Sequence, residues 1–316
     1  MSLSLQEWIE TVDGAYLSTF IKEGGSAIKV AVQADGRELT IERLRRLAGG
    51  LGYVVAVVDA SQTKVHLVDQ LFFAVSRQVG WEALAARLRE QAIVESAYKV
   101  GSTDLPTFES IAEANDVDPG MVRRELEMWF TAHVLRDPRM SQEFRHAMAT
   151  LCLEPFKGPV RFEGLYQSVL DWLTGDLRLI SALRPAQIFQ KVTRTNARDL
   201  FISLGHWSRK AKLSGLVIII DIAACATARR SESGGAIFYN RSMTMALYEV
   251  LRQFIDSTDD LDSVFMTVVT APEFLTDDSR GLAIYDALRM RVAEEVRDRT
   301  RENPLATLVR LEVRGQ

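Results

Sequence analysis

Two kinds of hydrophobic pattern alternate along the first part of the chain. The run AIKVAV (27–32) alternates as a short strand does, and YVVAVVDA (53–60) is almost wholly apolar, which is typical of a strand buried on both faces of a sheet. Residues 4–23, 40–52 and 64–79 instead repeat their apolar positions at helical spacing. A strand–helix–strand–helix order of this kind predicts a βαβα unit with a parallel sheet.

The pattern changes in the middle of the chain and then returns. Between residues 81 and 213 only helical periodicity recurs, whereas GLVIIIDIA (215–223) and SVFMTVVTA (263–271) again indicate buried strands, and the tail NPLATLVRLEV offers a last one. We therefore predict one α/β core of the P-loop NTPase type, AAA+-like, with its parallel sheet flanked by helices and interrupted by a large all-helical insertion. The expected divisions are 1–80 for the first half of the core, 81–213 for the insertion and return helix, and 214–316 for the second half.

Composition narrows the class of protein further. The chain has 316 residues, 47% of them hydrophobic, and a formal net charge of -4, which argues against a protein that coats nucleic acid through bulk charge. Two cysteines and four scattered histidines show no metal-ligand spacing, so no metal site is expected. No signal sequence opens the chain and no apolar run is long enough to span a membrane, so we expect a cytoplasmic protein without membrane contact.

The first predicted strand leads into a helix through QADGRELT, the place of a phosphate-binding loop. In the pattern G-x-x-x-x-G-K-[ST], backbone N–H groups wrap the phosphates, the lysine reaches the β/γ-phosphates and the hydroxyl binds Mg²⁺. Aligned here, Glu38 replaces the second glycine, Leu39 replaces the lysine, and Thr40 alone keeps its type, with Gly36 inside the loop. An ordinary βα turn is the simpler interpretation of these residues.

Two later strands end in polar residues that complete such a site. Asp221 follows four apolar residues, as does the Walker B aspartate that holds Mg²⁺-bound water, but Ile222 stands where a catalytic glutamate usually follows. Thr270 ends the next strand, at the sensor position of AAA+-like ATPases. Gly36, Thr40, Asp221 and Thr270 are therefore predicted to form a vestigial nucleotide and magnesium site.

Four segments together resemble a known family. FIKEGGSAIKVAV, GYVVAVVDAS, NARDLFISLGHWSRKAKLSGLVIIID and TAPEFLTDDSRGLAIYDALRMRV are similar to the P-loop ATP-binding proteins of BREX phage-defence islands in bacteria. The resemblance spans nearly the whole chain, is weakest over 81–185, and is most specific around PEFL and RGL. It implies an AAA+-like ATPase that works with a helicase or other defence components on DNA.

The chain departs from this family at the residues that handle ATP. Members carry Gly-Lys-Ser/Thr and Asp-Glu where this chain has Glu38-Leu39-Thr40 and Asp221-Ile222. We therefore predict a degenerate member, a pseudo-ATPase without a catalytic residue or a required cofactor, that binds a helicase, an active paralogue, another defence protein or a second copy of itself.

Two alternatives remain open. A divergent ATPase would bind ATP and Mg²⁺ through Thr40 and Asp221, with Lys22, Lys29 or Lys64 replacing the missing lysine. A DNA-binding module would use FESIAEANDVDPGMVRRELEMWF (108–130), which has helix-turn-helix spacing.

Six arginines are candidates for contacts with phosphate, DNA or a partner. Arg123 and Arg124 belong to the second helix of 108–130, where an αα-hairpin packed on the core is the alternative to DNA binding. The candidates that face a partner or phosphate are Arg229 and Arg230 in the polar loop 226–235, and Arg280 and Arg289 after the 263–271 strand. Salt bridges with neighbouring acidic residues such as Asp286 are the alternative for the last two.

Overall fold

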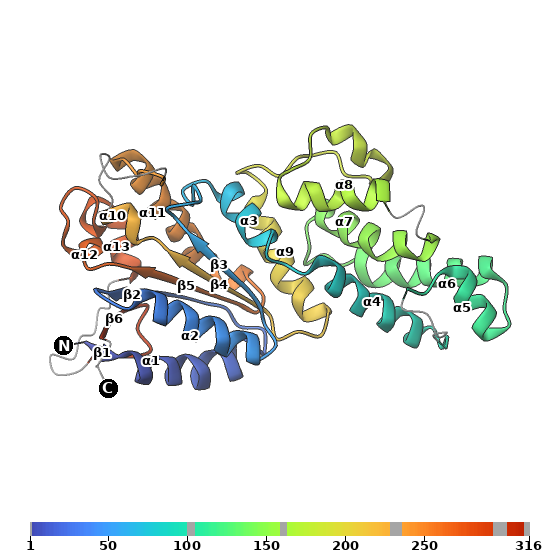
Figure 1. The fold of residues 1–316 in the computed structure, drawn as a ribbon, viewed down its shortest axis with the longest axis horizontal. Helices are drawn as coiled ribbons and strands as arrows, with labels where there is room; N and C mark the ends of the chain where they lie inside the picture. Colours follow the sequence, from blue (N-terminus) through green and yellow to red (C-terminus); the bar gives the residue numbers. More distant parts are fainter. Residues whose placement is uncertain (1, 100–104, 159–162, 228–235, 293–301, 313–316) are drawn as a thin grey trace. The chain divides into compact units, whose positions relative to one another are not determined.

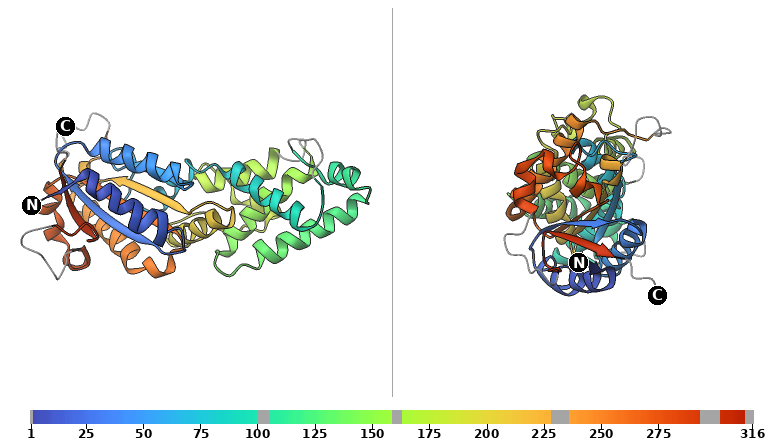
Figure 2. Two further views of the ribbon diagram at one scale, coloured as in Figure 1. Left: turned by 90° about the horizontal axis from the view of Figure 1, so that it is seen from below. Right: turned by 90° about the vertical axis from the view of Figure 1, so that its left-hand side faces the viewer.

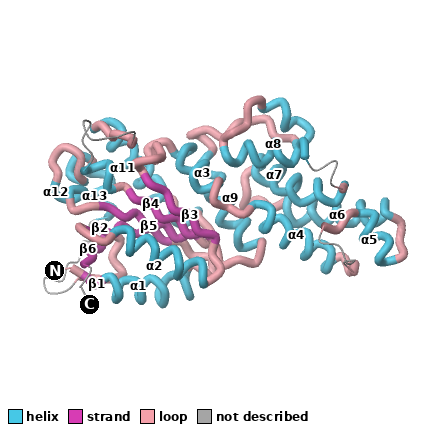
Figure 3. Tube along the Cα trace, in the orientation of Figure 1, coloured by secondary structure: helices cyan, strands magenta, loops and turns pink. Residues whose placement is uncertain are grey.

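The computed structural model describes residues 2–99, 105–158, 163–227, 236–292 and 302–312. The chain divides into two compact units, Met1–Val79 with Leu213–Gln316, and Gly80–Lys212. Figure 3 shows the strands confined to the first unit, and none occurs in the described residues of the second. No helix in the described part of the chain is long and apolar enough to cross a membrane.

A six-stranded parallel sheet forms the centre of the first unit (Figure 1). Its strands are β1 (Leu3–Ser4), β2 (Ala27–Gln33), β3 (Val54–Asp59), β4 (Leu216–Asp221), β5 (Val264–Thr270) and β6 (Leu308–Glu312). Their order across the sheet is β1-β6-β2-β5-β4-β3, and every adjacent pair is parallel. The predicted α/β fold of the P-loop NTPase type is confirmed, with β2 to β6 at the expected runs and β1 as an addition.

Helices cover both faces of this sheet. They are α1 (Leu5–Thr11), the π-helix η1 (Val12–Phe20), α2 (Arg37–Gly50), α3 (Val68–Ser76), α10 (Ala223–Thr227), α11 (Arg241–Asp256), α12 (Glu273–Thr276) and α13 (Asp286–Val292), with 3₁₀ turns η7 (Thr258–Asp260) and η8 (Leu282–Ile284). β1 and β6 pair at one margin, so the dark blue and dark red ends of the described chain lie side by side (Figure 2).

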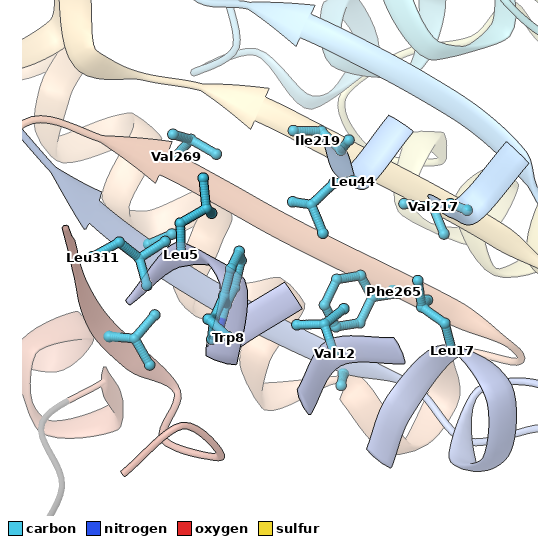
Figure 4. Packing of buried hydrophobic residues seen from close by; sticks show 14 of the residues in the cluster. Leu5, Trp8, Val12, Leu17, Leu44, Val217, Ile219, Phe265, Val269 and Leu311 are labelled. Atoms are coloured by element: carbon cyan, nitrogen blue, oxygen red, sulfur yellow. The ribbon is translucent and has the colours of Figure 1, made fainter. Parts of the chain in front are cut away.

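The main apolar core lies between α1, η1, α2 and one face of the sheet. Figure 4 shows Leu5, Trp8, Val12 and Leu17 facing the strands, and Leu44 joins them from α2. Burial of such side chains stabilises the unit by roughly 1.5–3 kcal/mol each. Alternate residues of the strands point to this face of the sheet, and their side chains pack against the helices.

The predicted single helix over 4–23 is wrong in its second half, where the chain forms the π-helix η1. The spacing of fully buried residues lengthens there from four (Trp8 to Val12) to five (Val12 to Leu17). A π-helix has a wider turn than an α-helix, so Leu17 reaches the core. The Tyr16 ring of the same turn lies 4.4 Å from the Lys29 amine, a cation–π contact.

The second unit contains only helices among its described residues. They are α4 (Trp81–Glu95), α5 (Phe108–Asn115), α6 (Pro119–Phe130), the π-helix η2 (Thr131–Leu135), α7 (Gln142–Leu153), α8 (Glu163–Thr174) and α9 (Ala197–Lys210), with 3₁₀ turns η3 (Glu154–Lys157) and η5 (Ile180–Ala186). A buried polar cluster ties the segment before α7 to α9. Asp137 lies 2.8 Å from His206 Nε2 and 2.9 Å from the Lys210 amine.

Substitution of Asp137 by asparagine is expected to lower the unfolding free energy by about 2 kcal/mol, because charged hydrogen bonds within the cluster are lost. Burial alone would raise the pKa of this carboxyl, but hydrogen bonds from Lys210 and His206 outweigh burial and hold the pKa well below its ordinary value. The stabilisation is therefore complete above about pH 4 and is lost as the pH falls further.

Urea denaturation at pH 7 and at pH 3 measures this difference. The exposed Asp199→Asn in α9 is the matched control and should change stability by less than about 0.5 kcal/mol. An Asp137→Asn effect that persists undiminished at low pH would contradict the charged-cluster interpretation.

Candidate functional site

Four parallel strands end in polar residues at one edge of the sheet. β2 ends at Gln33, β5 at Thr270, β4 at Asp221 and β3 at Asp59. β5 lies between β2 and β4, so Thr270 separates the loop after β2 from Asp221. Asp59 and Asp221 are paired in register, so their carboxylates share one face of the sheet. Ligands of open parallel sheets bind outside this carboxyl edge.

The turn between β2 and α2 is short and tight. Only residues 34–36 separate the strand from the helix, and Gly36 has φ 75°, a conformation that favours glycine. Residues 37–40 already belong to α2, and the Thr40 N–H donates to the Gly36 carbonyl at 3.2 Å, so these residues form an ordinary helix N-terminus. A P-loop requires a longer run of free backbone at this position.

The hydroxyl of Thr40 is bound within the protein. The Thr40 side chain is fully buried, and Oγ1 donates to Gln33 Oε1 at 2.6 Å. In a P-loop this hydroxyl faces the magnesium ion. Here the hydrogen bond ties the first turn of α2 to the end of β2, which is a structural role.

Asp221 lies in an environment that disfavours its charge. Burial raises its pKa, and the nearby carboxylates of Asp59 and Glu38 raise it further. The Ala223 N–H, which donates to Asp221 Oδ1 at 2.9 Å, and the Arg37 guanidinium act in the opposite direction. Arg37 also donates to the Ala34 carbonyl at 3.1 Å, so it lies across the short turn.

Thr270 keeps the polar atom that the sensor position requires. Its side chain is fully buried at the end of β5, in register with Val32 of β2. Its hydroxyl has no hydrogen-bond partner among the described residues. Of the four predicted vestigial-site residues, Thr270 and Asp221 therefore end neighbouring strands, whereas Gly36 and Thr40 shape the turn.

The three lysines proposed to replace the P-loop lysine lie in different places. Lys29 is buried on β2 and donates to the carbonyls of Leu305 and Ala306, at 2.5 and 3.2 Å. Lys22 precedes β2 and lies at the opposite, amino edge of the sheet. Lys64 follows β3 and is the one of the three at the carboxyl edge.

These residues do not fit the phosphate chemistry of a P-loop. The short turn offers no lysine, Glu38 adds a negative charge beside it, and the Thr40 hydroxyl is already bonded to Gln33. In the described parts of the chain, no group of three or more histidine, cysteine or acidic side chains is placed to hold a metal ion.

The arginines after β5 are engaged within the first unit. Arg280 lies over the Phe238 ring, 5.4 Å from its centroid, and its backbone N–H donates to Asp277 at 2.8 Å. Arg289 pairs with Asp286 at 2.8 Å on the surface of α13, as the salt-bridge alternative expects. Arg229 and Arg230 lie outside the described residues.

The segment 108–130 forms two helices with a short turn, within the second unit. Asp116 closes α5 in a left-handed conformation (φ 53°), and the Asp118 side chain caps α6 by accepting from the Met121 N–H. Arg123 and Arg124 are both exposed on α6. Arg123 pairs with Glu127 one turn away, at 2.8 Å.

Sequence reasoning missed three residues of the edge: Gln33, Arg37 and Asp59. Asp59 ends the run YVVAVVDA as Asp221 ends its own strand, so the same signal could have found it. Arg37 and Gln33 carry no such signal, because their roles depend on the rotamers that the short turn imposes.

One comparison with known proteins gives a match. Residues 161–313 match the model of a family described as BREX system ATP-binding protein BrxC/D. No curated protein and no solved structure is significantly similar. The matched region contains β4, β5 and β6 together with the helices that join them.

We expect Asp221→Asn to stabilise the protein at neutral pH. Because the pKa of Asp221 is raised in the fold, its ionisation opposes folding as the pH rises above the ordinary carboxyl range. Asparagine keeps the acceptor for the Ala223 N–H and removes that charge. Thermal unfolding at pH 7 should therefore give a higher Tm than wild type, with the gain shrinking below about pH 4.

The matched control is Asp35→Asn in the adjacent turn, an exposed carboxylate whose removal should leave the Tm within about 1 °C. A lower Tm for Asp221→Asn at pH 7 would mean that the ionised carboxylate is stabilised in the fold.

Proposed function

With the chain taken as a member of the BREX ATP-binding protein family, we propose that it is a non-catalytic subunit of a bacterial phage-defence complex. It keeps the parallel α/β core as an interaction surface and has lost ATP hydrolysis. BREX is a multi-component system, so membership suggests that the chain works within an assembly. The partner proposed is a helicase, an active ATPase paralogue or another defence component, or a second copy of this chain.

One observation carries the proposal. The Thr40 hydroxyl, the one P-loop side chain retained in its aligned position, donates to buried Gln33. A magnesium ligand at this position would need that bond broken and the hydroxyl turned outward, at a cost of roughly 1–3 kcal/mol for the group left unpaired. The absence of a lysine at Leu39 removes the charge that would offset this cost.

A divergent ATPase is the competing enzyme hypothesis. Its strongest support is the pair Asp221 and Thr270, which end neighbouring strands at the carboxyl edge, with Lys64 at the same edge. Against it, the Glu38 carboxylate acts on Asp221 from the side of the turn, where a nucleotide phosphate would lie, and the opposite charge of Arg37 is the compensation there.

Calorimetric titration with Mg-ATP and with Mg-ADP separates the two hypotheses. A non-catalytic subunit should show no micromolar binding of nucleotide that depends on both Mg²⁺ and Asp221. The titration curves of Asp221→Ala and of wild type should therefore be the same. Micromolar, Mg²⁺-dependent binding that Asp221→Ala weakens tenfold or more would establish the divergent ATPase, since metal coordination through this carboxylate is then required.

DNA binding through α5 and α6 is a second candidate function. It is favoured by the short turn at Asp116–Asp118 and by the exposure of Arg124 on the second helix, where a helix-turn-helix contacts its groove. Glu127 neutralises Arg123, and further carboxylates of this segment oppose phosphate. We therefore rank this function below the interaction subunit.

A gel shift with duplex DNA at about 50 and 200 mM salt tests this candidate. If α6 contacts phosphate, Arg124→Ala should weaken binding at every sequence and lower the salt slope by about one, whereas the exposed Arg87→Ala of α4 should not. Absence of a shift at the lower salt concentration would exclude the candidate.

A further inference from the structure

The segment that joins α8 to α9 in the second unit is long and strongly basic. Residues 175–196 lie between the two helices and contain one regular element, the 3₁₀ turn η5. Connections of this length without a helix or strand are uncommon in compact units and usually serve a function. The stretch 177–198 contains no aspartate or glutamate, although the whole chain has a net charge of -4. Its basic residues are Arg178, Arg184, Lys191, Arg194 and Arg198.

Hydrogen bonds bring three of these basic residues close together. The Lys191 amine donates to the Arg178 carbonyl at 3.0 Å, so the two arms of the segment meet. After η5 the chain reverses at Gln187 (φ 57°), whose N–H donates to the Arg184 carbonyl at 2.9 Å. The side chains of Arg178, Arg184 and Lys191 are exposed, and neither arginine forms an ion pair with another described residue.

Carboxylates flank the segment without entering it. Asp171 and Asp176 precede it and Asp199 follows it, and with all three counted the stretch 171–199 still has a net charge of +2. The Asp176 carboxylate accepts from the Thr174 hydroxyl at 2.7 Å. A surplus of positive charge on the segment therefore remains to attract an anion.

Phe189 is held out in solvent in the middle of the basic stretch. Its side chain is 63% exposed, whereas Ile188 before it and Val192 after it are buried. The Gln190 carbonyl accepts from the indole N–H of buried Trp172 at 2.8 Å, which fixes the backbone next to the ring. Among the described residues, no aromatic ring or cation stacks on Phe189. An open aromatic ring among cations is the arrangement on which the bases of single strands stack.

We propose that the segment 177–198 binds single-stranded nucleic acid, with a base stacked on Phe189 and the backbone phosphates bound by the surrounding cations. A duplex keeps the faces of its bases stacked on one another, so a protein ring that stacks on a base selects a single strand. DNA and RNA share this chemistry. The surface uses no residue of α6, and the proposal depends neither on the family match nor on the loss of ATP hydrolysis.

Fluorescence anisotropy of labelled oligothymidylate and oligouridylate, titrated with the full chain at about 50 and 200 mM salt, tests the proposal. We expect saturable binding of at least one oligomer, and weaker binding at the higher salt concentration. Phe189→Leu keeps an apolar side chain but removes the ring, so it should weaken binding by about tenfold at both salt concentrations. Phe189→Tyr keeps the ring and should bind as wild type does.

Arg184→Gln tests the phosphate contact separately. It should lower the slope of log affinity against log salt by about 0.7, whereas Phe189→Leu should leave that slope unchanged. The matched controls are Phe20→Leu, at an exposed ring of η1, and Arg87→Gln, at an exposed arginine of α4, and each should change the affinity less than about twofold. All these variants should keep the wild-type Tm, because the substituted side chains are exposed.

Four outcomes would each overturn the proposal. They are no binding of either oligomer at the lower salt concentration, equal affinities of Phe189→Leu and Phe189→Tyr, equal weakening by the control variants, and a duplex bound as tightly as the single strands. Binding to phosphatidylserine vesicles without binding to either oligomer would assign the segment to a membrane surface instead.

Discussion

The parallel direction of all six strands is the constraint on which the rest of the structure depends. Because the strands run the same way, Gln33, Asp59, Asp221 and Thr270 all reach one edge of the sheet, although they lie far apart in the sequence. Parallel pairing also requires both faces to be covered, which explains why helices lie on each side. The position of the candidate site and the apolar core follow from the same arrangement.

At that edge, several polar groups are bonded to one another within the protein. The Thr40 hydroxyl is paired with Gln33, the Ala223 N–H binds Asp221, and Arg37 lies across the turn, donating to Ala34. Each of these hydrogen bonds satisfies a polar group within the protein. The turn is therefore stable in its present form within the parallel sheet.

The sequence alone was sufficient to predict most strands of the sheet. It was not sufficient to predict which side chains at the candidate site are bonded to one another. Continuous apolar runs predicted β3, β4 and β5, because a strand buried on both faces tolerates few polar residues, whereas alternation in AIKVAV indicated β2 and the tail NPLATLVRLEV indicated β6. β1 was missed because two residues give no period, and η1 because a π-helix differs from an α-helix only in the spacing of its buried residues. Aligned motifs located Thr40 and Asp221, but only side-chain geometry shows that Gln33 accepts the Thr40 hydroxyl.

The most direct test of the account is phosphate release from ATP with the protein in excess over nucleotide, which detects even a single slow turnover. The account predicts that wild type and Asp221→Ala release phosphate at the same rate as buffer containing Mg²⁺ alone. A wild-type rate above that background, reduced to it by Asp221→Ala, would contradict the loss of ATP hydrolysis.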